Sequence, residues 1–596
     1  MTKTTRAIKL YGTDEPVSKP RLLHAGHLTA MLDNGAIRYI RYRGVEVLRG
    51  IAFLLRDRNW GTYAAAIEGL KLRQGKHGFT VSYVATCRDP TQAIRYEAQI
   101  TGKADGTLSF AATGTPLTDF ITNRTGFVVL HPLEGVVGKP VDVLHTDGKR
   151  ERAKFPRLIS PGQPIFNIRS LTHTVMPGVA ATVLMEGNTF EMEDHRNWMD
   201  ASYKTYVRSL LDPWPYTLPK AQPFTQSVTL TVSGKPTQKP PRRGSAVIAI
   251  AVGGVKGRMP AIGVGVAMRE AEATLACASR IVASHLVCQI DGCQNNQPQA
   301  AAAYAELKAR TKIPVTLEII LPAREPARAE TASIAKVVRE AGLAPDAVVI
   351  TQVHDLKSFQ PGAPRPFGPS YEDMAAAARM AFPGIPLGGG MLSYFTELNR
   401  KRPPQGLFDF ITHTLCPIVH AADDISVMET LEALPSIIAS ARAIIGKSPY
   451  HWGPSGISAR GNPYGAAVAE NPDNARICLA NNDPRQRGLF AAAWTLGLIA
   501  AAAKGGLDAV SLGAVTGPQG VIDGNILAGL APASGARRLE ATSSAPAKVT
   551  ALAHQSKSGP ALWLANMTAE TQKVRHGRKS IELGPYAVVA DSNLRL

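Results

Sequence analysis

The segment 191–206, EMEDHRNWMDASYKTY, gathers carboxylate, imidazole, guanidinium, ammonium and aromatic side chains in a short stretch. Its first half has no apolar spacing of 2 or 3.6 residues, so it is not an ordinary core strand or helix. Its second half alternates and predicts a strand with Ser202, Lys204 and Tyr206 on one face. Such groups converge in pockets that bind hydroxylated or anionic small molecules. A solvated loop is the simpler alternative, but exposing Trp198 would be costly.

This segment resembles part of the bacterial D-apionate lactonase family. Three later runs carry the same resemblance: HTLCPIVHAADDISVMETLEALP (413–435), GPSGISARGNPYG (453–465) and NDPRQRGLFAAAW (482–494). Their order and spacing also fit, and the resemblance extends over nearly the whole chain. It implies a three-part hydrolase that opens the lactone of a branched sugar acid, converting D-apionolactone to D-apionate in apiose catabolism. Composition and spacing alone do not identify that substrate.

The composition is that of a globular protein, with 45% apolar and 19% charged residues. A chain of 596 residues is too long for one core, and three domains are expected. The 66 basic and 47 acidic residues give a net charge of +19, which suggests attraction to anions. Basic runs with interleaved aromatic residues are missing, so we expect no nucleic-acid partner. A small sugar lactone with an anionic product agrees with this charge.

The cysteine pattern and the first residues of the chain bear on location. The six cysteines form no CxxC pair, which argues against a zinc ribbon or a disulfide framework and indicates reduced thiols. The first residues lack the apolar core of a signal peptide, and no run of about 18 apolar residues predicts a membrane span. We therefore expect a cytoplasmic protein without a membrane partner. The sequence leaves the oligomeric state open.

Residues 1–240 are predicted to form an N-terminal antiparallel β-sandwich. Apolar and polar residues alternate along many short segments, and Asn34-Gly35 and Asp105-Gly106 are typical of hairpin turns. Almost no helical periodicity interrupts this pattern. The run KPTQKPPRRG at 235–244 then predicts a proline-rich basic linker.

Residues 245–525 are predicted to form a (β/α)8 TIM-like barrel, because eight strands alternate with about seven helices. The expected strands lie at 246–254, 286–290, 314–323, 347–353, 386–392, 408–415, 448–453 and 508–515. A doubly wound sheet is the alternative, but GxGxxG does not follow the first strand. Residues 530–545 are predicted to form a second linker, and 540–596 a small C-terminal β-domain.

The active site of such a barrel lies at the carboxyl ends of its strands. Opening a lactone requires attack of water on an ester carbonyl, assisted by a base and by a group that stabilises the oxyanion. We predict catalytic roles for two carboxylates and two histidines: Glu397, Glu318, His354 and His413. A loop of the sandwich is expected to lie across the barrel mouth. The predicted substrate-binding residues are Asp194, His195, Arg196, Asn197, Lys204, Asp291, His420 and Arg460.

Each of these residue types also has a structural explanation. A glutamate within a barrel strand, such as Glu318, is often a buried charge paired with a cation. A single histidine at a strand end is often a hydrogen-bonding scaffold residue. Arg460 can instead form an interdomain salt bridge.

Covalent and metal-assisted mechanisms are less well supported by the spacing. Gly453-Pro454-Ser455-Gly456 is one residue away from the GxSxG nucleophile motif. Cys416 lies near two histidines in sequence, but a buried thiol is the better interpretation. His413 and His420 lie seven residues apart, which is not a metal-binding spacing, so we predict no cofactor while leaving a divalent metal open. Asp424 is predicted to cap a helix.

Three functions are compatible with these features to different degrees. A lactonase follows from the resemblance and the polar barrel mouth. A glycoside hydrolase with a TIM-barrel catalytic domain is the alternative, with Glu318 and Glu397 as its carboxylate pair. Against it, His354-Asp355 and His451 stand where common retaining barrels carry glutamates. The number of titratable groups at the mouth argues against a third possibility, a non-catalytic carbohydrate-binding protein.

Overall fold

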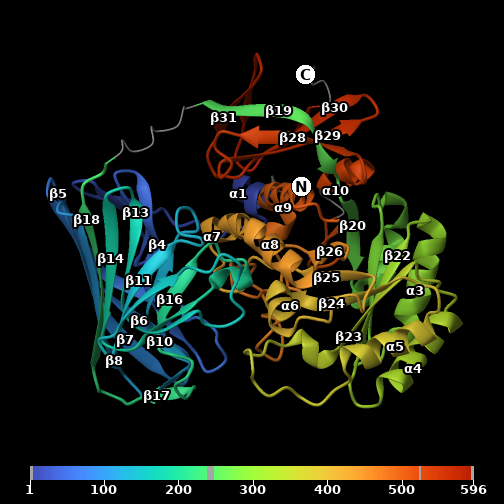
Figure 1. Cartoon of the computed structure of the whole chain (residues 1–596), viewed down its shortest axis with the longest axis horizontal. Helices are drawn as coiled ribbons and strands as arrows, with labels where there is room; N and C mark the ends of the chain where they lie inside the picture. Colours follow the sequence, from blue (N-terminus) through green and yellow to red (C-terminus); the bar gives the residue numbers. More distant parts are fainter. Residues whose placement is uncertain (1–4, 238–246, 522–524, 592–596) are drawn as a thin grey trace. The chain divides into compact units, whose positions relative to one another are not determined.

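The computed structural model describes residues 5–237, 247–521 and 525–591 (Figure 1). Its contacts divide the chain into two compact units. The sandwich unit comprises Pro16–Arg196 and Ala201–Arg243, and the barrel unit comprises Met1–Glu15, Asn197–Asp200 and Gly244–Leu596. The predicted linker at 235–244 lies largely outside the described residues.

The sandwich unit is built from antiparallel strands. They are β1 (Arg21–Ala25), β2 (Leu28–Asp33), β3 (Ala36–Tyr42), β4 (Val45–Arg56), β5 (Ala66–Gly75), β6 (Gly78–Arg88), β7 (Ala93–Lys103), β8 (Thr107–Pro116), β9 (Phe120–Thr122), β10 (Arg124–His131), β11 (Pro140–His145), β12 (Arg150–Lys154), β13 (Ile165–Met176), β14 (Val179–Glu186), β15 (Phe190–Glu193), β16 (Tyr203–Val207), β17 (Tyr216–Leu218) and β18 (Phe224–Gly234).

One continuous sheet runs through most of these strands in the order β1-β2-β3-β4-β10-β16-β15-β13-β14-β18-β8-β7-β6-β5, with β11 paired to β13 and β12 paired to β11. It folds over itself, since β1 contacts β5, β6 and β7, and β10 contacts β18. Alternating side chains on the inner faces form the core, where the Phe53 ring packs 5.2 Å from that of Phe127. The predicted β-sandwich is confirmed. So is the Asn34-Gly35 hairpin, whose two turn residues have positive φ.

The barrel unit contains a closed parallel barrel of eight strands, as predicted. They are β20 (Ala261–Val266), β21 (Leu286–Asp291), β22 (Val315–Leu321), β23 (Ala347–Gln352), β24 (Leu387–Tyr394), β25 (Phe410–Thr414), β26 (Tyr450–Ser455) and β27 (Ala509–Leu512). The described helices of this unit are α1 (Arg6–Tyr11), α2 (Ala271–Ala276), α3 (Gln297–Thr311), α4 (Ala327–Glu340), α5 (Tyr371–Ala381), α6 (Phe395–Lys401), α7 (Asp424–Glu429), α8 (Leu434–Ile445), α9 (Leu489–Lys504) and α10 (Asn525–Leu530). Among the described residues, none of the helices has the length and apolarity needed to cross a bilayer.

The first barrel strand was predicted wrongly. The apolar run 246–254 belongs to β19 (Val247–Arg258), and the first barrel strand is β20. The sequence AIGVGV of β20 is short and contains two glycines, which weakens its strand signal. At both glycines, neighbouring atoms lie too close to leave room for a Cβ. A Cβ on Gly263 would lie 2.4 Å from the His285 ring, and one on Gly265 would lie 2.2 Å from the Gly513 carbonyl oxygen.

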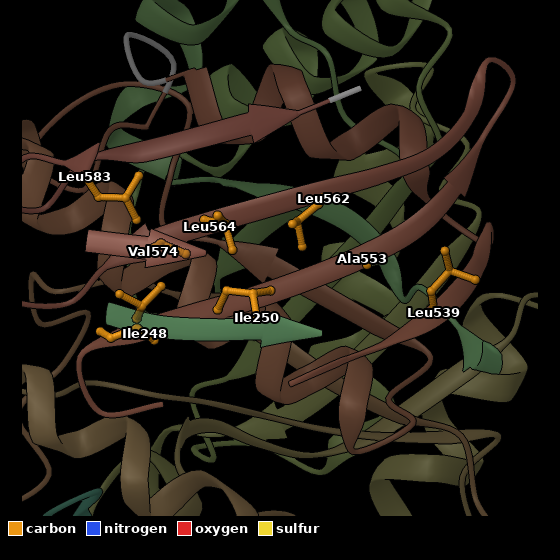
Figure 2. Close-up of a cluster of buried hydrophobic side chains, with 9 residues drawn as sticks. Ile248, Ile250, Leu539, Ala553, Leu562, Leu564, Val574 and Leu583 are labelled. Carbon is orange, nitrogen blue, oxygen red and sulfur yellow. The ribbon is translucent and has the colours of Figure 1, made fainter. Parts of the chain in front are cut away.

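Strand β19 belongs to the seven-stranded C-terminal sheet, whose order is β32-β31-β19-β28-β29-β30-β33. The other strands are β28 (Arg537–Ser543), β29 (Val549–Ser556), β30 (Gly559–Asn566), β31 (Gln572–His576), β32 (Lys579–Leu583) and β33 (Val588–Asp591). Figure 2 shows the buried cluster that joins them, in which Ile248 and Ile250 of β19 lie with Leu562, Leu564 and Val574. The predicted linker at 530–545 is wrong as well, because a 3-10 turn at Ala531–Ala533 and strand β28 lie within it.

Candidate active site at the carboxyl ends of the barrel strands

A buried ion pair lies inside the barrel. Glu318, in the middle of β22, is 1% exposed, and both of its carboxylate oxygens accept hydrogen bonds from the Arg460 guanidinium. Gln289 of the neighbouring strand β21 donates from Nε2 to the same carboxylate at 3.4 Å. Arg460 follows β26 in the chain, and its side chain is 19% exposed. A guanidinium has five N–H donors, so Arg460 keeps donors for a ligand after binding Glu318.

A cavity of about 190 Å³ lies on the other side of Glu318, toward the amino ends of the strands. His285, His451 and Ser511 are among its lining residues. Burial lowers the pKa of both histidines to about 4, so both are neutral at pH 7. His285 Nε2 lies 2.9 Å from Ser511 Oγ. Glu318 therefore stands between this cavity and the Arg460 side of the barrel.

The segment Asn197–Asp200 belongs to the barrel unit by its contacts. The backbone carbonyl of Asn197 accepts a hydrogen bond from Thr396 Oγ1 at 2.7 Å, and its side-chain Oδ1 accepts one from Asn399 Nδ2 at 2.9 Å. Both donors lie on α6, directly after barrel strand β24. These bonds hold the segment at the carboxyl end of the barrel.

Trp198 is the centre of an aromatic cluster at this end of the barrel. Its ring packs 5.6 Å from His420, which follows β25, and 5.3 Å from Tyr464, which follows β26. The Arg400 guanidinium lies 5.7 Å from the Trp198 ring. Loops from three adjacent strands thus meet around one buried indole.

Asp200 and His420 form a carboxylate–imidazole pair. His420 Nδ1 lies 2.8 Å from Asp200 Oδ2, and the two side chains are 16% and 15% exposed. Partial exposure keeps this pair within reach of water.

The loop that follows β26 joins the buried ion pair to the Trp198 cluster. Arg460 reaches Glu318, while Tyr464 packs on Trp198. Four residues of chain span at most about 14 Å between Cα atoms. The Cα atoms of Arg460 and Tyr464 therefore lie within about 14 Å of each other on the loop that follows β26.

Glu397 is completely buried and caps α6. Its Oε2 accepts the backbone N–H of Tyr394 at 2.9 Å, and Oε1 has no hydrogen-bond partner among the described residues. Burial raises the pKa of this carboxyl, while Lys401 and Arg400 oppose the shift. This position favours a structural role and does not fit Glu397 as one of the two accessible carboxylates that a glycosidase uses.

The two histidines predicted to transfer protons lie in different environments. His354 is partly exposed, directly after β23 at the carboxyl end of the barrel. His413 is fully buried. Its neighbour Thr412 lines the barrel cavity, so His413 points from the opposite face of β25. There its Nε2 lies 2.6 Å from Tyr450 Oη, and Nδ1 lies 2.9 Å from the Thr414 carbonyl oxygen. This placement does not support contact between His413 and a substrate.

Burial lowers the pKa of His413 to about 4, against 6.5 for an exposed imidazole. Between pH 6.5 and 4 the unfolded chain binds the proton more readily, so the free energy of unfolding should fall as the pH falls. The full shift corresponds to roughly 3 kcal/mol for this residue. Urea unfolding at pH 7, 6 and 5 should show a shallower pH dependence in His413→Gln than in the wild type. The same pH dependence of unfolding in both proteins would contradict a lowered pKa for His413.

Inside the sandwich unit, Asp194 and Arg196 pair with each other. Arg196 Nε and Nη2 donate to the two Asp194 carboxylate oxygens at 2.8 and 2.7 Å. Nη2 also donates to the Pro156 carbonyl at 2.8 Å, and the guanidinium lies 4.6 Å from the Tyr203 ring centre. Neither side chain of the pair has measurable exposure. Both were predicted to bind substrate, and this packing favours a structural role.

The other predicted residues of the sandwich unit also have protein partners. Lys204 Nζ lies 2.5 Å from Glu193 Oε2. Burial alone would raise the pKa of Glu193, but the Lys204 ammonium holds it well below its usual range. His195 Nδ1 lies 3.1 Å from Ser202 Oγ.

Further predicted residues occupy loops of the barrel unit. Asp291 accepts from the Cys293 backbone N–H at 2.9 Å and from Gln294 Nε2 at 2.8 Å, which fixes the turn after β21. Asp423, and not Asp424, caps α7, because its side chain accepts the Ser426 N–H. Asp424 instead pairs with two arginines, Arg476 and Arg485.

Sequence reasoning missed Asp200, Trp198, Arg400 and Tyr464 as members of one cluster. Asp200 and Trp198 stand in the 191–206 run, and Tyr464 stands in 453–465, so the unusual composition of both runs was the available signal. Arg400 lies in α6, which no amphipathic pattern marked, because this helix is buried almost throughout.

The closed parallel barrel, with polar and titratable side chains at its carboxyl end, defines a TIM-barrel enzyme. Family models described as the N-terminal, TIM barrel and C-terminal immunoglobulin-like domains of D-apionate lactonase match residues 8–235, 262–554 and 546–590. A curated D-apionate lactonase of Brucella anthropi is 44% identical over 601 residues, covering 97% of this chain and 98% of that protein. The chain belongs to the D-apionate lactonase family. It is a lactone-hydrolysing enzyme, that is, a carboxylic-ester hydrolase.

Two solved structures have a distant likeness to parts of the chain. A GH30 endoxylanase of Clostridium papyrosolvens is 10% identical with a TM-score of 0.35, covering 58% of this chain and 98% of that one. A galactose 1-epimerase of Lactobacillus acidophilus is 8% identical with a TM-score of 0.26, covering 37% and 96%.

Proposed function

We propose that this protein hydrolyses D-apionolactone to D-apionate as a step of apiose catabolism. The observation that carries the proposal is the 44% identity with a relative named D-apionate lactonase, which extends over 97% of the chain. A match of this extent includes the barrel strands and the loops that form the candidate site.

The chemistry of the candidate site agrees with this reaction. Water adds to the lactone carbonyl, negative charge develops on the carbonyl oxygen, and the ring C–O bond then breaks. Arg460 carries a permanent positive charge at the barrel mouth, held in place by Glu318. In this proposal Arg460 donates to the developing oxyanion, and Glu318 fixes the orientation of the guanidinium.

Hydrolysis at constant pH tests the proposal, since each lactone opened releases one proton. With D-apionolactone the wild-type protein should consume alkali far above the spontaneous rate. With an aryl glycoside it should release no nitrophenol. Alkali consumption at only the spontaneous rate, or release of nitrophenol, would contradict the proposal. A related aldonolactone measured in parallel reports how strictly the branched sugar is required.

A further inference from the structure

We propose that His420 is the general base that activates water and that Asp200 is the residue that positions its ring. The inference rests on the proposed lactone hydrolysis and assigns the proton transfer within it. The 2.8 Å contact between His420 Nδ1 and Asp200 Oδ2 has the geometry of a histidine oriented by a carboxylate. A carboxylate on Nδ1 favours the tautomer with the proton on that nitrogen, which gives Nε2 the lone pair that accepts a proton.

Partial exposure distinguishes His420 from the buried His413, although His354, His285 and His451 are partly exposed as well. The His420 side chain is 16% exposed, whereas His413 has no measurable exposure. A base must reach the attacking water directly or through one further water. His420 follows β25 and so lies at the end of the barrel where such enzymes act.

Asp200 is held by its own short segment. Two residues earlier, Trp198 packs edge-on against the His420 ring, with an interplanar angle of 74°. Asn197 is bound by Thr396 and Asn399 of α6. The segment Asn197–Asp200 therefore contacts the His420 ring through Trp198 and Asp200, and hydrogen bonds from α6 hold Asn197 at its start. Precise placement of the ring is what efficient proton transfer requires.

The proton transfers balance without a further reactant. Nε2 of His420 removes a proton from water as the water oxygen bonds to the lactone carbonyl carbon. The imidazolium then gives this proton to the ring oxygen as the ring C–O bond breaks. The new carboxylic acid loses its proton to solvent, which gives one carboxylate and one proton for each water consumed.

The test compares kcat and KM for D-apionolactone in His420→Ala, Asp200→Asn and Asp200→Glu. In His420→Ala we expect kcat to fall about 10²–10⁴-fold with a smaller change in KM. Added imidazoles should restore part of kcat, and the restored rate should rise with the pKa of the imidazole. Asp200→Asn should also lower kcat, and Asp200→Glu should recover part of the loss. The exposed His77 offers a matched control, and His77→Gln should behave as the wild type.

The following results would contradict the role of His420 as the general base. A His420→Ala protein that is folded by circular dichroism and keeps wild-type kcat has no base at this position. Loss of kcat without rescue by any imidazole indicates a structural contact. Inactivation of the wild type by a chelator, reversed by a divalent metal, would make His420 a metal ligand. If the wild-type protein does not hydrolyse D-apionolactone, the proposed function is wrong. If the wild type and His420→Ala are both active, only the role of His420 is wrong.

Discussion

Arg460→Met should lower kcat/KM for the lactone by about 10²–10³-fold, because the developing oxyanion loses its positive partner. The same change should lower the free energy of unfolding by about 3–5 kcal/mol, because Glu318 is left as a charge in the barrel interior without its cation. Steady-state kinetics and urea unfolding of one preparation measure both effects.

The double variant Glu318→Leu/Arg460→Met separates the two effects. Replacing both charges by apolar side chains of similar size removes the uncompensated charge, so much of the stability should return. Activity should stay low, because the guanidinium is still missing. A double variant with recovered kcat/KM would show that Arg460 acts only on folding.

Arg196→Met should destabilise the sandwich unit by about 3–5 kcal/mol. The change leaves the Asp194 carboxylate buried without its bidentate partner and removes the guanidinium that packs on Tyr203. Thermal unfolding followed by calorimetry should show a clearly lower midpoint.

Arg169→Met is the matched control for this prediction. Arg169 pairs with Glu186 on the surface of the same unit, with 41% and 45% exposure. Its loss should cost less than about 1 kcal/mol, since water and salt screen an exposed pair. If Arg196→Met and Arg169→Met lower the unfolding midpoint equally, burial of the Asp194–Arg196 pair does not determine its contribution to stability.

The barrel could be predicted because strand-like apolar runs alternate with helical segments along residues 245–525. The first barrel strand is the exception, and it shows that an apolar run alone does not identify the sheet to which a strand belongs. The run 246–254 is as apolar as a barrel strand, yet Ile250 of β19 pairs with Ser543 of β28, 293 residues later, and Val247 pairs with Lys573 of β31, 326 residues later. No local sequence pattern distinguishes a strand that pairs with a distant sheet from one that forms the first strand of the barrel.

The candidate site was predicted less completely than the fold. Glu318 was expected inside the barrel, but its partner Arg460 comes from a loop 142 residues later. His413 was chosen for its place at a strand end. A strand alternates its faces at every residue, and the carboxyl end of β25 turns Thr412 inward and His413 outward. Asp200 and His420 are 220 residues apart, so only the folded chain reveals their pairing.

A crystal structure with bound D-apionate tests most directly whether the carboxyl end of the barrel is the active site. We expect the product carboxylate to accept a hydrogen bond from Arg460 and the ligand to lie beside His420. Product bound instead in the cavity lined by His285 and His451, with the Arg460 side of the barrel unoccupied, would contradict it.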